Sequence, residues 1–236
     1  MSLNQPSGNM YIWAFTWNVL MGICPHVCSY CYVSKSIAPM LKKWGNEKYY
    51  GKLRLDEKAL KDRLTIDNKF VVFVQSCGDL FAEDVPSKWI LRVLEHCKKY
   101  PDTTFLFQTK NPARFQEFQN DFPPKFILGT TLETNKSELA DPLTKAPGIN
   151  KRFVAMLNLP GYVRKMISVE PVIDFDVAEF TQMIDYIKPE FVSIGADSKN
   201  CGLQEPSKEK IKKFIENLEY FQMEVRLKDN LKRLRG

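Results

Sequence analysis

The sequence predicts an α/β protein built on a parallel sheet, a (β/α)6 barrel that is closed or nearly closed. Six apolar runs typical of strands alternate with stretches of helical periodicity along the chain. The connections between them are short, and right-handed crossovers place the helices outside such a sheet. With 236 residues and 44% hydrophobic content, the chain can bury one large core. We therefore expect a single domain over residues 1–236.

The expected elements follow one another as strand, then helix. Strands are predicted at 10–17, 70–75, 103–108, 126–132, 166–169 and 191–195, with a last one at 223–227. Helices are predicted at 30–43, 56–64, 87–99, 112–118, 150–159, 176–187 and from 207 onward. The run 70–75 is continuously apolar, as buried parallel strands are. Segment 134–149 is the longest irregular stretch, and loops of that length are often functional or mobile.

Charge and hydropathy indicate a protein of the cytoplasm. Charged residues make up 26% of the chain, and no apolar run reaches the roughly 18 residues that a membrane-spanning helix needs. Residues 1–8 lack the basic and then apolar pattern of a secretion signal. The net charge of +6 favours an anionic partner such as nucleic acid without requiring one. The basic C-terminal segment 223–236 fits phosphate contact and a solvated helical tail equally well.

Three of the six cysteines share one loop, which joins the first strand to the first helix. Cys24, Cys28 and Cys31 are separated by three and then two residues, too close in sequence to pair well as disulfides. The remaining cysteines are scattered singly: Cys77, Cys97 and Cys201. Three thiolates at these spacings can hold three irons of a [4Fe–4S] cluster and leave the fourth iron for a non-protein ligand.

The cysteine loop has two other interpretations. A structural zinc site with His26 as fourth ligand would make the protein a non-catalytic binding module. Such sites usually draw their ligands from two paired knuckles, and the sequence has no second pair. The only other histidine, His96, falls within a predicted helix. A nucleophilic cysteine needs one activated thiol and a partnered base, not three clustered thiols.

Polar residues follow the predicted strands, and in barrels the chemistry sits at the C-terminal ends of the strands. In chain order these residues are Asn18, Ser76, Asp79, Lys110, Thr131, Glu133, Glu170 and Asp197. Glu170, before Pro171, is expected to point into the barrel mouth. Helix capping, a solvated lysine and an exposed carboxylate are the plain alternatives for Asp79, Lys110 and Glu133. Trp17 fits core packing better than substrate contact.

The motif Cys24-x3-Cys28-x2-Cys31, with Tyr30 before the last cysteine, resembles the signature of the radical S-adenosylmethionine (SAM) superfamily. The resemblance implies a partial TIM barrel with a [4Fe–4S] cluster whose unique iron is chelated by the amino and carboxylate groups of SAM. One electron, from a donor such as flavodoxin or ferredoxin, would cleave the sulfonium. The resulting 5′-deoxyadenosyl radical would abstract hydrogen, while the protein positions and shields it.

The resemblance also implies roles for single residues. Cys24, Cys28 and Cys31 would hold the cluster, and the backbone of Tyr30 would approach adenine. Ser76 and Asp79 would bind the amino group of SAM, and Lys110 would bind its methionyl carboxylate. Thr131 and Glu133 would contact its ribose. The two-glycine-glutamate form usual after the second strand is absent here.

Further strand-end motifs resemble a phage-encoded and bacterial branch of the superfamily that is distantly similar to spore photoproduct lyase, a thymine-dimer repair enzyme. They are Trp17-Asn18 and the runs 76–81, 109–112, 168–171 and 228–231. This implies modification, isomerisation or repair of a nucleobase or nucleic acid, with a protein or small metabolite as the alternative substrate. Cys77, as a hydrogen-atom donor, and Glu170 are the candidate catalytic residues. Asn18, Trp17, Asp197 and Lys228 are the candidate substrate contacts.

Overall fold

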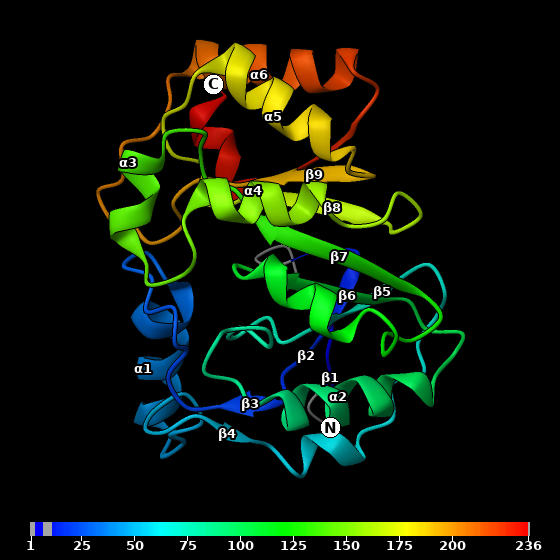
Figure 1. The fold of residues 1–236 in the computed structure, drawn as a ribbon. Coiled ribbons are helices and arrows are strands. Elements are labelled where there is room, and N and C mark those ends of the chain that lie inside the picture. The colour runs from blue at the N-terminus through cyan, green and yellow to red at the C-terminus, as the bar shows by residue number, and fades with distance from the viewer. Residues whose placement is uncertain (1–2, 7–10, 236) are drawn as a thin grey trace.

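The computed structural model describes residues 3–6 and 11–235, so Met10 at the predicted start of the first strand and Gly236 lie outside the described residues. Its centre is a curled eight-stranded sheet in the order β1-β2-β5-β6-β7-β8-β9-β10 (Figure 1). The parallel strands are β2 (Ala14–Trp17), β5 (Val71–Val74), β6 (Phe105–Thr109), β7 (Phe126–Thr131), β8 (Lys165–Val169), β9 (Phe191–Ile194) and β10 (Glu224–Leu227). β1 (Leu3–Asn4) pairs antiparallel with β2. The sheet stays open between β1 and β10, which confirms the predicted partial barrel.

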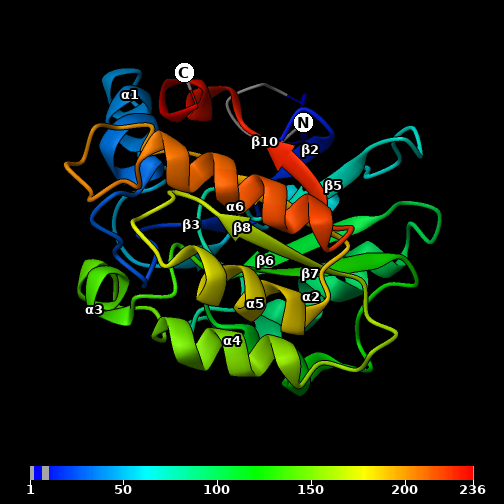
Figure 2. The ribbon, with the colours of Figure 1, turned by 90° about the horizontal axis from the view of Figure 1, so that it is seen from above.

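Helices cover the outer face of this sheet, as Figure 2 shows. They are α2 (Ser87–Lys98), α4 (Ile149–Leu157), α5 (Val177–Ile187) and α6 (Lys208–Tyr220). Their apolar stripes pack on outward side chains of the strands, for example Phe214 and Ile184 in the same core as Val192. Asp176 and Ser207 cap α5 and α6 by accepting backbone N–H bonds from Glu179 and Lys210 at 3.0 and 3.3 Å. No helix among the described residues is long and apolar enough to cross a membrane.

A second, smaller apolar cluster lies on the inner face of the sheet. It consists of Tyr11, Ala14, Phe73, Leu106, Ile127, Met166 and Phe191, with Trp13 packed against it. Because side chains alternate along a strand, Phe73 faces this cluster whereas Val72 and Val74 face the helices. Trp13 stacks on Tyr11 at 4.6 Å and meets Phe191 edge-on at 5.1 Å. The inner face therefore has an apolar floor at the N-terminal halves of its strands.

Several elements differ from the sequence prediction. The first strand, expected over 10–17, begins only at Ala14. Tyr11 precedes it and belongs to the inner cluster, whereas Trp17, with 0% exposure, belongs to the outer core. Residues 112–118 form a 3-10 helix (Pro112–Phe118), and the predicted helix 56–64 is only a 3-10 turn, Ala59–Lys61. Pro112 opens its segment where its missing N–H is not needed.

The segment 134–149 is more regular than expected, because it contains α3 (Ser137–Ala140) and a 3-10 turn, Asp141–Leu143. The predicted helix 30–43 exists as a π-helical turn, Val33–Ile37, that runs into α1 (Ala38–Lys43). Between β2 and α1, β3 (Leu20–Met21) pairs antiparallel with β4 (Arg54–Leu55). A 3-10 helix, Asp229–Leu234, follows β10. Both figures place α1 and α3 at the same end of the molecule, where the cysteine loop also emerges.

Candidate active site

The cysteine loop leaves the C-terminal end of β2 and carries three half-buried thiols, Cys24, Cys28 and Cys31. Burial raises the pKa of the Cys24 and Cys28 thiols, and negative charge on Cys31 would raise both further. Burial thus disfavours the free thiolates, and a coordinating metal would favour them. In the described part of the chain no three His, Cys, Asp or Glu side chains converge on a single metal ion. A [4Fe–4S] cluster does not require such convergence, because each thiolate binds a different iron.

His26, the ligand that a zinc site would need, is paired with a carboxylate in the interior. Its Nε2 lies 2.8 Å from Oδ2 of Asp79, and both side chains are almost fully buried. Asp79 also accepts hydrogen bonds from the Thr109 hydroxyl and from the backbone N–H groups of Lys110 and Phe81, at 2.7 to 2.9 Å. Burial alone would raise the pKa of the Asp79 carboxyl, but His26 and these donors outweigh it and lower the pKa below its usual value. Asp79 thus ties the cysteine loop to the ends of β5 and β6.

A second tie joins the loop to β7 and α4. Glu133 has 0% exposure, and its Oε1 contacts both the Tyr30 hydroxyl and Lys110 Nζ. Its Oε2 accepts from Arg152 Nη1 at 2.8 Å, and Lys110 Nζ lies 3.0 Å from the Tyr30 hydroxyl. Burial would raise the pKa of Glu133, but the charges of Lys110 and Arg152 lower it to about 2. The residues expected at the methionyl carboxylate and at the ribose therefore bind each other.

Arg152 is the residue of this group that the sequence did not indicate. It lies on α4 with 0% exposure, and its Nη1 also donates to the Thr131 carbonyl at 3.0 Å. Its Nη2 is buried without a hydrogen-bond partner among the described residues. An arginine in a predicted amphipathic helix is normally a surface residue. The one sequence signal for the burial of Arg152 is its spacing, which places it on the apolar side of that helix.

The loop after β5 lies directly against the end of β2. Asn18, 4% exposed, donates from Nδ2 to the Ser76 hydroxyl at 3.2 Å and accepts the Cys77 backbone N–H at 2.7 Å. Tyr32, one residue after the last cysteine, donates to the Ser76 carbonyl at 2.8 Å, and its hydroxyl lies 3.7 Å from Cys77 Sγ. Burial, and then the neighbouring Cys77, raise the pKa of both Tyr32 and Tyr49, so both hydroxyls keep their protons at neutral pH.

A polar layer covers the apolar floor of the inner face. At its centre Glu170 accepts hydrogen bonds from Ser193 Oγ at 2.6 Å and from the Tyr11 hydroxyl at 3.4 Å. Its other oxygen forms an ion pair with Lys228. Lys228 Nζ also lies 4.6 Å from the centre of the Tyr11 ring. The structure thus brings together Glu170 and Lys228, two residues that the sequence placed in separate strand ends.

Gln108 extends the same layer toward β7. Its Oε1 accepts from the Tyr11 hydroxyl at 3.0 Å, and its Nε2 donates to Thr131 Oγ1 at 3.2 Å. Tyr11, Gln108 and Ser193 were missed by sequence reasoning. The available signal was the strand alternation, since Gln108 and Ser193 are two residues away from inward apolar positions on β6 and β9.

Asp197 and Trp17 are not part of this layer. Asp197 organises its own loop by accepting the backbone N–H groups of Lys199 and Cys201. Arg233 donates to the Asp197 carbonyl at 3.0 Å and pairs with Glu205, which closes that loop onto the C-terminal 3-10 helix. Trp17 donates its indole N–H to the Ala59 carbonyl at 3.3 Å within the outer core.

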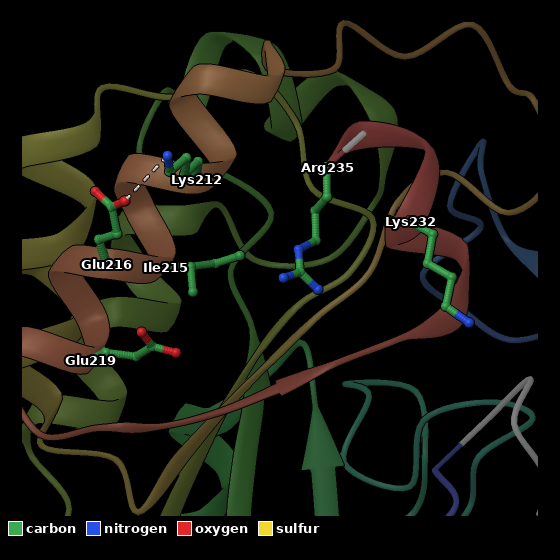
Figure 3. A pocket seen from close by; sticks show the side chains of 6 residues that line it. All are labelled: Lys212, Ile215, Glu216, Glu219, Lys232 and Arg235. Atoms are coloured by element: carbon green, nitrogen blue, oxygen red, sulfur yellow. Dashed lines mark ion pairs between the residues drawn. The ribbon is translucent and has the colours of Figure 1, made fainter.

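The basic C-terminal run is divided between internal contacts and the surface. Arg226 stacks over Phe191 and Trp13, and Lys228 is paired with Glu170. Lys232 and Arg235 instead line a hollow of about 490 Å³ between the C-terminal 3-10 helix and α6 (Figure 3). Its α6 side carries Lys212, Ile215, Glu216 and Glu219. Both acidic and basic side chains line it, so this hollow is not a uniformly positive phosphate site.

Comparison with known proteins gives a family and a fold. The model of the family described as "Protein of unknown function (DUF5131)" matches residues 10–198. No curated protein matches the sequence. Among solved structures, a mutant of spore photoproduct lyase is similar with a TM-score of 0.65 at 10% identity, over 97% of this chain and 79% of that chain.

Two further structures show the same likeness. Spore photoproduct lyase complexed with dinucleoside spore photoproduct is similar with a TM-score of 0.60 at 10% identity, over 91% of this chain and 76% of that one. A radical SAM methyltransferase from Sphaerobacter thermophilus gives 0.57 at 14% identity, over 91% and 65%. These TM-scores, over more than nine tenths of this chain, establish the fold and confirm the partial barrel that the resemblance implied.

Proposed function

Because the chain belongs to the DUF5131 family and has the fold of radical SAM enzymes, we propose that it is a radical SAM enzyme acting on a nucleobase or nucleic acid. The observation that carries this proposal is the position of Cys24, Cys28 and Cys31. Their loop leaves the C-terminal end of the first parallel strand, beside the polar ends of β5, β6 and β7. A three-thiolate set at this place leaves one iron open, which is what SAM chelation requires.

In this proposal, different residues bind the cluster and SAM. Cys24, Cys28 and Cys31 hold the [4Fe–4S] cluster, which together with SAM would supply one electron and a 5′-deoxyadenosyl radical when bound. Ser76 and the backbone of Tyr30 and Cys77 border the position expected for the cofactor. Lys110, Thr131 and Glu133 remain proposed contacts to its carboxylate and ribose, although Lys110 would then share its charge with Glu133.

The polar layer is the proposed place of the substrate. Glu170 and Lys228 form a net neutral pair, and the surrounding groups are hydroxyls and an amide. Such a layer presents donors and acceptors without excess charge, which suits a neutral planar group with hydrogen-bonding edges better than it suits a phosphate. The nucleobase interpretation is further supported by the dinucleoside named in a similar solved structure and by the net charge of +6.

Anaerobic reconstitution with iron and sulfide tests the enzyme proposal. We expect a brown protein whose visible absorbance bleaches with dithionite and which cleaves SAM to 5′-deoxyadenosine. The variants Cys24→Ala, Cys28→Ala and Cys31→Ala should each lose cluster iron and this cleavage, whereas Cys201→Ser should keep both. Tightly bound zinc and no SAM cleavage in the wild-type protein would establish the zinc module instead.

The substrate class is tested by isotope transfer. Deuterium from perdeuterated DNA, RNA or nucleosides should appear in 5′-deoxyadenosine when the correct substrate is present, because the radical abstracts a substrate hydrogen. Labelled peptides and small metabolites serve as comparison substrates. Transfer from one of these, and from no nucleic acid or nucleoside, would favour the alternative of a protein- or metabolite-modifying radical SAM enzyme.

A further inference from the structure

The segment between β7 and α4, residues 132–148, contacts the cysteine loop and is called the strap below. Ser29 donates its backbone N–H to the Leu143 carbonyl at 2.8 Å, and Lys145 donates to the His26 carbonyl at the same distance. Between them, Thr144 Oγ1 lies 3.2 Å from Cys28 Sγ and 3.1 Å from the His26 carbonyl oxygen. Cys28 and Thr144 are 116 residues apart in sequence. Four contacts thus join residues 26–29 to 143–145.

The strap is fixed on both sides of Thr144. Glu133 before it and Arg152 after it are joined by a fully buried ion pair of 2.8 Å. Asp141 Oδ1 accepts the Ile149 backbone N–H at 2.9 Å, and a Cβ placed on Gly148 would lie only 2.5 Å from Asp141 Oδ2. Thr144 Oγ1 itself accepts the Ala146 backbone N–H at 3.1 Å. The Thr144 hydroxyl is therefore held at its distance from Cys28 by the fold.

The direction of the hydrogen bond between Thr144 and Cys28 depends on which of the two side chains carries a proton. As a metal-bound thiolate, Cys28 carries no proton and can only accept. The Thr144 oxygen already accepts from Ala146, and its single proton can point either to the His26 carbonyl oxygen, at 3.1 Å, or to the Cys28 sulfur, at 3.2 Å. The competing acceptor, the His26 carbonyl, already receives the Lys145 N–H, so it stays satisfied when the Thr144 proton turns to sulfur.

We propose that Thr144 is a positioning residue that sets the reduction potential of the cluster by donating a hydrogen bond to the Cys28 sulfur. Hydrogen bonds to cluster sulfurs are one of the factors that set such potentials. The added electron makes the sulfurs more negative, so an O–H donor stabilises the reduced cluster more than the oxidised one. The Thr144 hydroxyl therefore raises the potential. This inference rests on the proposed function, since it requires the [4Fe–4S] cluster.

The test compares Thr144→Val, which keeps the shape and removes the hydroxyl, with Thr144→Ser, which keeps the hydroxyl. Redox titration of the reconstituted proteins without SAM, followed by electron paramagnetic resonance, gives the potential of each. We expect the reduced-to-oxidised ratio of Thr144→Val at a fixed solution potential to fall by about threefold to tenfold, where tenfold is about 59 mV for one electron. Thr144→Ser should stay close to wild type.

Thr134→Val is the matched control in the same strap. The Thr134 hydroxyl donates to the Asp174 carbonyl at 2.7 Å, away from the cysteines, so its removal should leave the potential unchanged. Iron and sulfide content and the circular dichroism spectrum verify that each variant is folded and loaded, and Thr144→Ala provides a second protein without the hydroxyl. Equal potentials for wild type and both loaded hydroxyl-free variants would overturn the inference alone. A wild-type protein that assembles no [4Fe–4S] cluster would overturn the proposed function as well.

Discussion

His26 Nε2 and Asp79 Oδ2 lie 2.8 Å apart in the interior, where they join the cysteine loop to the loop after β5. The same carboxylate receives three further donors from Thr109, Lys110 and Phe81. One residue thus organises three strand ends, and its loss should affect the whole site.

Asp79→Asn replaces one of the two accepting carboxylate oxygens by an NH2 group, which can only donate. Because the Lys110 N–H already points at Oδ2 while His26 also contacts it, the new NH2 group cannot satisfy both neighbours. We expect the free energy of unfolding, measured with urea at pH 7, to fall by about 2–4 kcal/mol. The exposed Asp84→Asn should change it by less than about 0.5 kcal/mol. Equal effects of the two substitutions would contradict this role of Asp79.

Glu133→Gln should lower stability in a pH-dependent manner. The pKa of Glu133 is about 2 in the folded protein against an ordinary value of 4.5, so its ionised form stabilises the fold above about pH 4.5 and this contribution disappears as pH falls toward 2. Near pH 7 we expect a loss on the order of 3 kcal/mol, which breaking a buried pair commonly costs.

Urea unfolding of wild type and Glu133→Gln between pH 7 and pH 2.5 tests this. The difference between the two proteins should be constant down to about pH 4.5 and shrink below it. Glu57→Gln, which breaks an exposed pair with Arg92, provides the control and should have a small effect throughout. A difference that stays constant to pH 2.5 would show that Glu133 is not held in its ionised form.

Cys77→Ser should separate radical formation from product formation. Cys77 Sγ lies beside the Tyr32 hydroxyl, and its thiol is the proposed donor of a hydrogen atom to the substrate radical. In that step a substrate C–H bond forms, the S–H bond breaks and a thiyl radical remains on Cys77. We expect 5′-deoxyadenosine to form at near wild-type rate while normal product falls at least tenfold. Unchanged product from Cys77→Ser would remove Cys77 from the reaction.

Gly195→Val should impair substrate binding without affecting the cysteine loop. A Cβ on Gly195 would lie 3.2 Å from Glu170, Lys228 and Asn230, so larger side chains displace the pair in the polar layer. We expect substrate-dependent deuterium transfer to fall at least tenfold, while cluster content and slow SAM cleavage without substrate persist. Gly161→Ala, in open space on the surface, is the control. Normal transfer by Gly195→Val would place the substrate elsewhere.

The sequence anticipated the order of strands and helices because apolar periodicity is local. It also anticipated that Lys110, Glu133 and Glu170 lie at the C-terminal ends of parallel strands. It did not anticipate their partners. Arg152 reaches Glu133, and Thr144 reaches the cysteine loop, only because distant parts of the chain pack together, and no short-range pattern encodes such contacts.

Two failures have specific physical causes. The first strand was expected from residue 10, but Tyr11 and Trp13 precede the observed strand, and their rings contact Lys228 and Arg226, at the end of the sheet opposite β2. The segment 134–149 was expected to be irregular. It instead contains α3 and a 3-10 turn with Pro142 in its first positions, and Gly148 is the N-cap of α4.

The ties made by Asp79, Glu133 and Thr144 have a consequence for how the holoprotein matures. Zinc fingers gain their shape from the metal, so their ligands are disordered until it arrives. Here hydrogen bonds from three distant parts of the chain already shape the loop that carries the thiols. Under the proposed function, the polypeptide is therefore expected to fold before it binds the cluster, so the protein without iron should already have a cooperative unfolding transition.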